Sequence, residues 1–434
     1  MSLPRYPEYK DSGVEWLGSV PAHWEVDALR RRAALNPSKA EVRAVETEKF
    51  VSFLPMEAVG ERGDLDLSRT RRVSEVLAGY TYFREGDIAF AKITPCFENG
   101  KGARMVGLRG GFGFGTTELT VVRPDPDLLD GHYLDWVLRS VPFRKRGEAA
   151  MYGAGGQKRV PDEFVREFVI GWPDIREQSL IAKFLDRETG RIDALLAEQE
   201  KLLALLAEKR QATISHAVTR GLDPNVPMKD SGIAWLGEVP AHWQVGPIKR
   251  YVEILDGRRV PLSAEERSYR PGDFPYYGAS GIIDSIDDYL FDEDLVLVSE
   301  DGANLLNRSS PIAFVARGRY WVNNHAHILR PVDGLVDFWA ARIEQLDLAP
   351  VVTGSAQPKL TIEALANLLV AVPPSALERQ SIGCYLEQHD RRISELESSA
   401  EKVIHLLKER RGALISAAVT GQIDVRGLIE ADAA

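Results

Sequence analysis

Two short polar loops carry the side chains best suited to hydrogen-bonding chemistry. The first reads Gly153-Ala-Gly-Gly-Gln-Lys-Arg159 and the second reads Gly354-Ser-Ala-Gln-Pro-Lys359. Glycine allows a backbone to approach a ligand closely, a glutamine amide can pair with adenine, and Lys or Arg can contact guanine or a phosphate. A solvated connector is the simple alternative, but the same kind of loop comes before each of two long helical patterns. The candidate nucleic-acid contacts are Gln157, Lys158, Arg159, Gln357 and Lys359.

Other basic and polar residues are candidates for contacts to phosphates or base edges. Each of them alone is more typical of a wet surface than of a binding site. They are Arg71, Arg72, Lys92, Arg144, Arg146, Arg258, Arg259, Arg317, Asn323, Asn324 and His325.

The sequence predicts neither a metal site nor catalytic residues. His325 and His327 alternate on an expected strand, which would place both side chains on one face. No cysteine or third histidine completes a metal site, so hydrogen bonding is the expected role. The glycine cluster 107–115 lacks the Lys-Ser/Thr of a phosphate loop. No dinucleotide fingerprint follows a strand, and Asn36-Pro-Ser is not the Asn-Pro-Pro-aromatic signature of amino-methyltransferases.

Composition limits the class of protein. The chain has 434 residues with 44% hydrophobic content, enough for two or more domains. The net charge of −10 excludes a basic DNA-coating protein, although residues 28–172 carry 23 Lys+Arg against 20 Asp+Glu. Residues 246–372 carry 12 against 18. No apolar run is long enough for a membrane span, and only Cys96 and Cys384 are present, so we expect a cytoplasmic, reduced protein.

The chain contains an internal repeat. Residues 10–26 read KDSGVEWLGSVPAHWEV and residues 229–245 read KDSGIAWLGEVPAHWQV, with 13 identical positions. The tryptophans are expected to be buried anchors, and His23 and His242 to be structural histidines. A repeat of this kind predicts internal pseudo-two-fold symmetry. The structural anchors are Trp16, Trp24, Trp235 and Trp243.

A second repeat predicts two long helices, since residues 174–223 align without gaps on residues 375–424. Glu177 and Glu378 each follow a capping residue at the spacing of a capping box. Both segments then show a heptad pattern over about 40 residues, or roughly 60 Å of helix. We expect the helices to pack antiparallel on each other, with intermolecular dimerisation as the rival. The seam residues are Ile181, Leu185, Ile192, Leu195, Leu202 and Leu206, then Ile382, Leu386, Ile393, Leu396, Val403 and Leu407.

The stretches between these elements predict mixed domains. Alternating, β-branched runs at residues 86–92, 118–123, 294–299 and 325–330 favour strands, and residues 130–139 favour a helix. The two stretches do not resemble each other in sequence outside their edges. The expected fold class is α+β, with two α/β domains separated by two long antiparallel helices in a coiled coil. The expected boundaries are 1–173, 174–220, 221–373 and 374–434.

With these pieces assembled, the chain resembles the DNA-specificity subunits of type I restriction–modification enzymes over nearly its whole length. The resemblance rests on WLGSVPAHW and WLGEVPAHW, Gly86-Asp-Ile-Ala-Phe-Ala-Lys92, Tyr276-Tyr-Gly-Ala-Ser-Gly281 and Trp321-Val-Asn-Asn-His-Ala-His327, with the two glutamine loops and both helices.

That resemblance implies a function. Each domain would be a target-recognition domain that reads one half of a split site in double-stranded DNA, and the helices would set the spacing. Two methyltransferase subunits would dock and carry S-adenosylmethionine, with translocating nuclease subunits as further partners, and this subunit would hold no cofactor and no active site. Two alternatives stay open: a catalytic DNA methyltransferase or nuclease with a cryptic site, and a coiled-coil scaffold without a nucleic-acid role.

Overall fold

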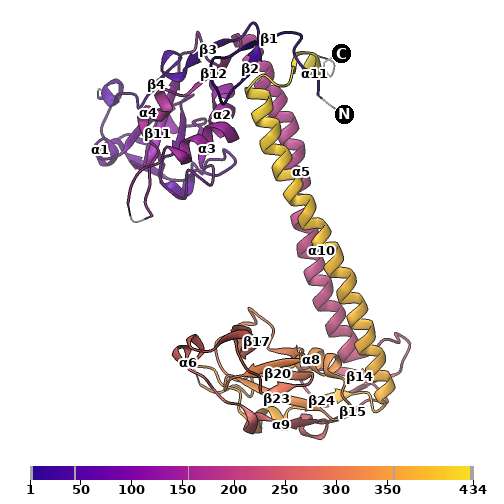
Figure 1. Ribbon diagram of the computed structural model, residues 1–434. Helices are drawn as coiled ribbons and strands as arrows, with labels where there is room; N and C mark the ends of the chain where they lie inside the picture. Colours follow the sequence, from indigo (N-terminus) through magenta and orange to yellow (C-terminus); the bar gives the residue numbers. More distant parts are fainter. Residues whose placement is uncertain (1–2, 44, 155, 355–356, 431–434) are drawn as a thin grey trace. The chain divides into compact units, whose positions relative to one another are not determined.

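The computed structural model describes residues 3–43, 45–154, 156–354 and 357–430. The chain divides into two compact units, Met1–Gln199 with Lys402–Ala434, and Glu200–Glu401. Each unit contains one β-rich domain and part of both long helices (Figure 1). The first domain is residues 9–172 and the second domain is residues 228–372. Within the described residues, no helix combines the length and apolar character that a membrane crossing requires.

The first domain is built on two four-stranded sheets. One has the order β6-β5-β10-β7, with β5 and β10 parallel, and the other has the antiparallel order β4-β11-β8-β9. Two-stranded ribbons, β1-β2 and β12-β3, join the domain to the long helices. The strands are β1 Tyr9–Asp11, β2 Ser19–Pro21, β3 Glu25–Ala28, β4 Ala33–Leu35, β5 Phe50–Leu54, β6 Thr70–Arg72, β7 Thr81–Arg84, β8 Ile88–Ala91, β9 Gly102–Arg104, β10 Phe112–Gly115, β11 Leu119–Pro124 and β12 Val169–Trp172; the helices are α1 Val73–Val76, α2 Gly131–Arg139, α3 Val141–Ala149 and α4 Asp162–Arg166.

The second domain repeats this strand order. Its sheets run β18-β17-β22-β19, with β17 and β22 parallel, and β16-β23-β20-β21, with ribbons β13-β14 and β15-β24. The shared frame is therefore larger than the sequence repeat, because hydrogen-bonded topology survives where side chains differ. The strands are β13 Met228–Asp230, β14 Glu238–Pro240, β15 Gln244–Pro247, β16 Val252–Ile254, β17 Pro271–Gly278, β18 Gly281–Ile286, β19 Phe291–Asp292, β20 Leu295–Ser299, β21 Ala313–Ala316, β22 Arg319–Val322, β23 Ala326–Pro331 and β24 Leu369–Val372; the helices are α6 Ala264–Ser268, α7 Asn304–Asn307, α8 Val336–Glu344 and α9 Ile362–Asn367.

Two long helices contact each other within the chain. They are α5, Ile175–Arg220, and α10, Ala376–Val419, and a short α11, Arg426–Glu430, follows. In the first unit Arg411 of α10 pairs with Asp193 of α5 (3.0 Å), and in the second Arg210 of α5 pairs with Glu397 of α10 (3.0 Å). The pairing is therefore intramolecular and antiparallel in both units, so the rival of helix pairing between chains is not needed.

The buried seam differs from the predicted one at equivalent places in both helices. Leu195 and Leu202 of α5, and their counterparts Leu396 and Val403 of α10, are exposed. In α5 the residue after each of these leucines is buried more deeply instead: Leu196 is only 1% exposed and Leu203 is half-buried. In α5 the apolar doublets Leu195-Leu196 and Leu202-Leu203 let a seven-residue repeat be drawn through either member, and only packing selects one of them. The other predicted seam residues are buried or half-buried: Ile181, Leu185, Ile192, Leu206, Ile382, Leu386, Ile393 and Leu407.

A buried carboxylate at the start of α5 explains the first His-Trp motif. Glu177 accepts hydrogen bonds from the indole of Trp24 (3.2 Å) and the hydroxyl of Tyr6 (2.6 Å), and its other oxygen lies 2.8 Å from His23 Nε2. Burial and the Glu177 carboxylate raise the pKa of Tyr6 far above its ordinary value, so the hydroxyl stays a donor. The capping box is only half formed: Asp174 accepts the Glu177 backbone N–H, while the Glu177 side chain turns to the motif.

The second His-Trp motif forms the same contact at the start of α10. Glu378 accepts from the Trp243 indole (2.9 Å), and its other oxygen lies 2.9 Å from His242 Nε2. We call these two sets of contacts the Trp–Glu clamps. The glycine that follows the other long helix packs against each clamp. Gly421 after α10 has φ +76°, and a Cβ there would come within 2.3 Å of Pro21, while Gly221 after α5 has φ +77° and faces Trp243.

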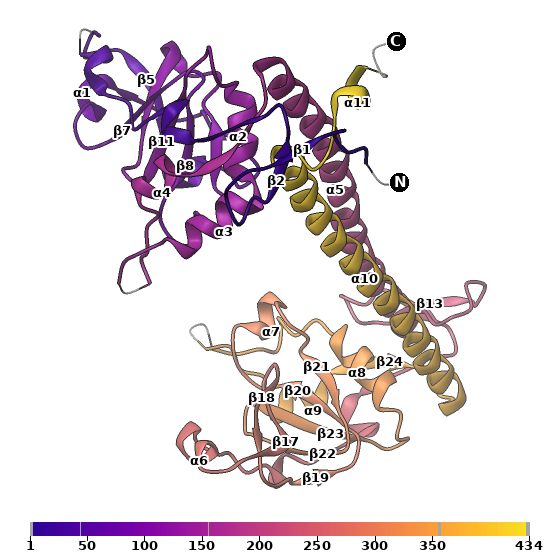
Figure 2. The ribbon, with the colours of Figure 1, turned by 45° about the horizontal axis from the view of Figure 1, so that its top comes forward.

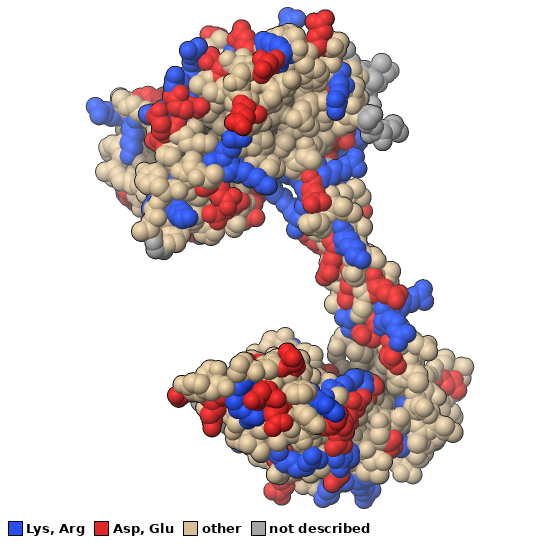
Figure 3. Space-filling view, viewed as in Figure 1, with Lys and Arg blue, Asp and Glu red and all other residues tan. Residues whose placement is uncertain are grey.

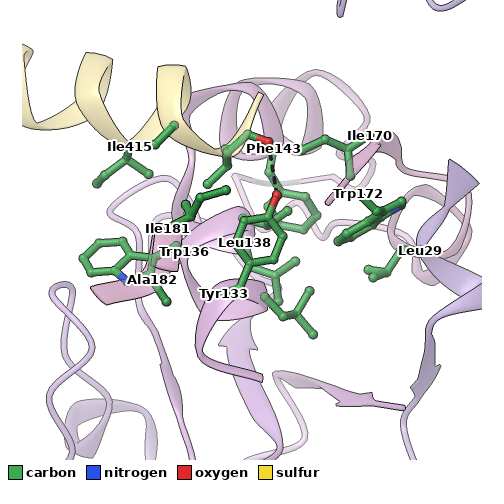
Figure 4. Packing of buried hydrophobic residues seen from close by; sticks show 14 of the residues in the cluster. Leu29, Tyr133, Trp136, Leu138, Phe143, Ile170, Trp172, Ile181, Ala182 and Ile415 are labelled. Carbon is green, nitrogen blue, oxygen red and sulfur yellow. Dashed lines mark hydrogen bonds between the residues drawn. The ribbon is translucent and has the colours of Figure 1, made fainter. Parts of the chain in front are cut away.

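Each clamp belongs to the largest apolar cluster of its unit. Around Trp24 the cluster joins α2, α3, β12 and the facing residues Ile181 of α5 and Ile415 of α10, as Figure 4 shows. Around Trp243 it joins α8 and β24 to Ile382 of α10 and Val218 of α5. Both long helices therefore contribute side chains to the core of each unit. Trp24 and Trp243 are fully buried, whereas Trp16 and Trp235 pack only partly buried against the cores.

We expect Glu177→Ala to lower the free energy of unfolding by about 2–5 kcal/mol, because it leaves the buried donors of Tyr6 and Trp24 without acceptors. Glu378→Ala is the matched control and should cost about 1 kcal/mol, since the Glu378 side chain is 32% exposed and water can replace it. Urea unfolding followed by tryptophan fluorescence measures both. A larger loss for Glu378→Ala would contradict this assignment.

Candidate nucleic-acid interface

The two glutamine loops are built alike. Tyr152 pairs with Arg159 across the first loop, and Thr353 pairs with Lys359 across the second, which is one residue shorter. Both loops project from the bodies of their domains (Figure 2). Glycine is required at the start of each, because a Cβ on Gly153 or Gly354 would come within 2.5 Å of a glutamine carbonyl. Gly155, Ser355 and Ala356 lie outside the described residues.

The loops present polar side chains that are available to a ligand. Gln157, Lys158 and Gln357 are exposed, and none of these side chains has a partner in the described part of the chain. Their backbones are nevertheless held. In the first loop the Thr94 hydroxyl donates to the Gly156 carbonyl (2.7 Å) and accepts from the Lys158 N–H (3.0 Å). A fixed backbone with free amide and ammonium groups suits base-edge recognition.

The basic residue that ends the first loop is held by an acid. Arg159 donates two hydrogen bonds to Glu118, at 2.9 and 2.8 Å. These bonds hold the pKa of Glu118 below its ordinary value and raise the pKa of Arg159. The peptide of Lys92 connects this pair to the loop, because its N–H donates to the Glu118 carbonyl and its own carbonyl accepts from Val160. Arg159 is thus a positioned cation, and a DNA phosphate would have to share it with Glu118.

The second loop ends in an equivalent pair. The Lys359 ammonium lies 3.1 Å from Glu300, which also receives Arg259 at 2.5 Å. Burial opposes ionisation of Glu300, but the bonds from Arg259 and Lys359 outweigh it and hold the pKa of Glu300 below its ordinary value. Arg259 is only 13% exposed and also contacts Asp256. Arg259 therefore supports the loop through both carboxylates.

The two candidate histidines do not share a strand face. His325 lies in the turn before β23, and its Nδ1 is 2.8 Å from Asp301 on an exposed surface. His327 lies inside β23, is fully buried, and contacts Asp256. The expectation of two histidines on one face was wrong because the strand begins only at Ala326. Ligand atoms of Asp256, Glu300 and His327 lie within 4.8 Å of one another, but Arg259 occupies the space between the carboxylates.

Several of the predicted phosphate contacts have partners within the chain. Arg144 lies against Phe97 and donates to the Phe97 and Gly100 carbonyls, and burial, with nearby Arg139, lowers its pKa to about 9. Arg146 stacks on Trp16 at 4.5 Å. Arg258 stacks on Phe291, and Arg317 pairs with Asp294 and Asp337. Asn323 is only 5% exposed, and its side-chain oxygen accepts a hydrogen bond from the His325 N–H.

The first domain does not bring Arg71 and Arg72 to its glutamine loop. Arg72 pairs with Phe50 at the first residue of β5. Gly115, the last residue of β10, pairs with Leu54 at the opposite end of β5, and Glu118 follows Gly115 closely in the chain. Both arginines are exposed, and each lies over a phenylalanine ring. Asn324 is exposed beside His325 in the second domain. On the face drawn in Figure 3, acidic and basic side chains are interspersed over both domains, as this extensive ion pairing requires.

The supporting residues of both loops were missed by sequence reasoning. Thr94 and Glu118 hold the first loop, while Asp256 and Glu300 hold the second. Of these four residues, only Glu118 lies in a predicted element, at the start of the strand expected over residues 118–123. The others are far from their loops in sequence, so no local pattern identifies them.

Comparisons with known proteins agree with this architecture. Residues 240–405 match the family described as "Type I restriction modification DNA specificity domain". Over 192 residues the chain is 39% identical to the type I restriction enzyme EcoAI specificity subunit and 38% identical to the EcoEI specificity subunit, both from Escherichia coli. Each match covers 44% of this chain and 32% of the relative, so the chain matches about a third of these relatives' length.

Solved structures share the fold. A chain from work on "complex assembly and conformational transition of the type I R-M system" has a TM-score of 0.73 at 16% identity, over 92% of this chain and 98% of that one. The HsdS subunit from Thermoanaerobacter tengcongensis has a TM-score of 0.56 at 16% identity, over 93% and 98%. Family model, relatives and fold all point to type I restriction–modification specificity subunits, and residues 240–405 carry the DNA specificity domain of that family.

Proposed function

We propose that this chain recognises DNA for a type I restriction–modification complex, with each domain reading one half of a bipartite target. The observation that carries the proposal is the pair of equivalently built loops, each closed by a bridge between its ends and each with an exposed glutamine. Glutamine pairs with adenine through two hydrogen bonds in the major groove. Arg159 and Lys359, held by Glu118 and Glu300, would contact bases or phosphates beside it.

Methyl transfer and DNA cleavage would be carried out by partner subunits. Two methyltransferase subunits would bind S-adenosylmethionine and transfer the methyl group, and translocating nuclease subunits would join them. This chain would contribute recognition alone and would act in the cytoplasm, where chromosomal DNA is found. The acidic net charge fits such a division, since partners can supply part of the grip on phosphates. The long helices would fix the distance between the two half-sites.

Each long helix carries an apolar stripe suited to a partner. On α5 it consists of Leu195, Leu202 and Leu205, and these side chains are between 39% and 50% exposed. On α10 it consists of the equivalent residues Leu396, Val403 and Leu406, between 41% and 61% exposed. Spacings of seven and three place each set on one side of its helix, beside the buried seam. Two equivalent stripes favour a partner that is present in two copies.

We expect Gln157→Ala to relax base choice in one half-site and Gln357→Ala to relax it in the other. Each lost bidentate contact should reduce discrimination by about 1–3 kcal/mol at one position. Mapping methylated bases in cells that contain this chain and its methyltransferase measures the effect, and each variant controls the other. Unchanged motifs for both variants would mean that the loops are solvated connectors.

We expect Leu205→Asp and Leu406→Asp each to weaken binding of one methyltransferase subunit by at least about tenfold, because a charge would replace an apolar contact. Ala204→Glu, at an exposed position on another side of α5, is the matched control and should bind normally. Native mass spectrometry counts the subunits in each complex. Complete assembly of both stripe variants would exclude this surface as a docking site.

A further inference from the structure

A buried hydrogen-bond chain lies beneath the second glutamine loop. His327 on β23 is fully buried, and its Nδ1 lies 2.6 Å from an oxygen of Asp256, in the 3₁₀ turn Asp256–Arg258. Its Nε2 lies 2.8 Å from the carbonyl oxygen of Leu360, the residue that follows Lys359. The other oxygen of Asp256 accepts the Ile328 N–H at 2.8 Å. Asp256 and the loop backbone are therefore connected through a single imidazole.

The proton positions follow from the partners. A peptide carbonyl only accepts hydrogen bonds, so Nε2 must carry the proton that is shared with Leu360. Nδ1 then either carries a second proton toward the Asp256 carboxylate or accepts one from it. In both cases a proton lies between His327 and Asp256, and the ring is locked in orientation. The Leu360 N–H is also used, since it donates to the Glu300 carbonyl at 2.8 Å.

We propose that His327, oriented by Asp256, is a positioning residue for the second half-site: it holds the Leu360 peptide and thereby sets the direction in which Gln357 and Lys359 leave the domain. This inference rests on the proposed DNA-recognition function. Leu360 is the right place for such control, because its N–H and its C=O are both hydrogen-bonded and it adjoins the Thr353–Lys359 pair that closes the loop. A one-ångström error in a contacting side chain is enough to lose a bidentate base contact.

The geometry favours this role over a cation site. Arg259 reaches both Asp256 (3.3 Å) and Glu300 (2.5 Å), and Lys359 reaches the second oxygen of Glu300. Both nitrogens of His327 already have partners. The carboxylates of this network are thus neutralised by the chain's own cations. The first loop has a different support, the exposed hydroxyl of Thr94, so the two half-sites should respond differently to substitution of a buried histidine.

The test uses the full chain together with its methyltransferase and reads the methylated motif in host DNA. The half-site affected by Gln357→Ala is taken as the second. His327→Ala removes the donor to Leu360, whereas His327→Gln restores an N–H donor near the position of Nε2. Val298→Ala is the matched control, because Val298 is fully buried and pairs with His327 across β20 and β23, but its side chain has no polar group that could hold Leu360. Thermal unfolding of each variant provides the stability scale.

We expect His327→Ala to reduce base discrimination in the second half-site about tenfold, the scale of one lost contact, with the first half-site unchanged. His327→Gln should recover most of that discrimination, and Val298→Ala should keep it at a similar loss of stability. If His327→Ala does not fold, His327→Leu, which fills the space but cannot donate to Leu360, takes its place. Second-half-site discrimination as high in the variant without a donor as in Val298→Ala would overturn the positioning role. A wild-type complex without a bipartite motif would instead refute the proposed function.

Discussion

The Trp–Glu clamp is the interaction on which the rest of the structure depends. A fully buried indole, that of Trp24 or Trp243, donates to a glutamate in the first turn of a long helix. The same indole lies against the glycine that ends the opposite helix, Gly421 or Gly221. Strand ribbon, helix start and helix end are thereby fixed in one core per unit. A buried donor without its acceptor would cost about 1–3 kcal/mol, so the clamp at the buried Glu177 strongly favours one arrangement, and the clamp at the partly exposed Glu378 does so more weakly.

The clamps leave the rest of each domain free to vary. Strand order is the same in both domains, yet the loops differ in their support. Glu118 and Thr94 hold the first, and Glu300, backed by Arg259, holds the second. Ladder hydrogen bonds come from the backbone and tolerate side-chain change, which explains how one frame can carry two different polar surfaces. A protein that reads two unrelated half-sites needs such a combination.

Helix positions and helix caps could be predicted from the sequence, because they depend on residues close together in the chain. Capping residues and heptads located both long helices, and Asp130 was placed correctly at the start of α2, where it accepts two backbone N–H groups. Long-range side-chain partners could not be found this way. Nothing near Arg144 indicates that it packs on Phe97, and nothing near His327 points to Asp256, 71 residues away. The choice between Leu195 and Leu196 also depended on packing, because both are equally apolar.

The proposed function makes the helix pair a spacer: the lengths of α5 and α10 would set the gap between the two half-sites. Inserting seven residues after Leu202 and seven after Val403 keeps the heptad register and adds roughly 10 Å of helix, about three base-pair steps. Methylation mapping in cells that express this variant with its methyltransferase tests the claim most directly. The account predicts unchanged half-site sequences separated by a spacer about three base pairs longer. Full modification at the original spacing would contradict it.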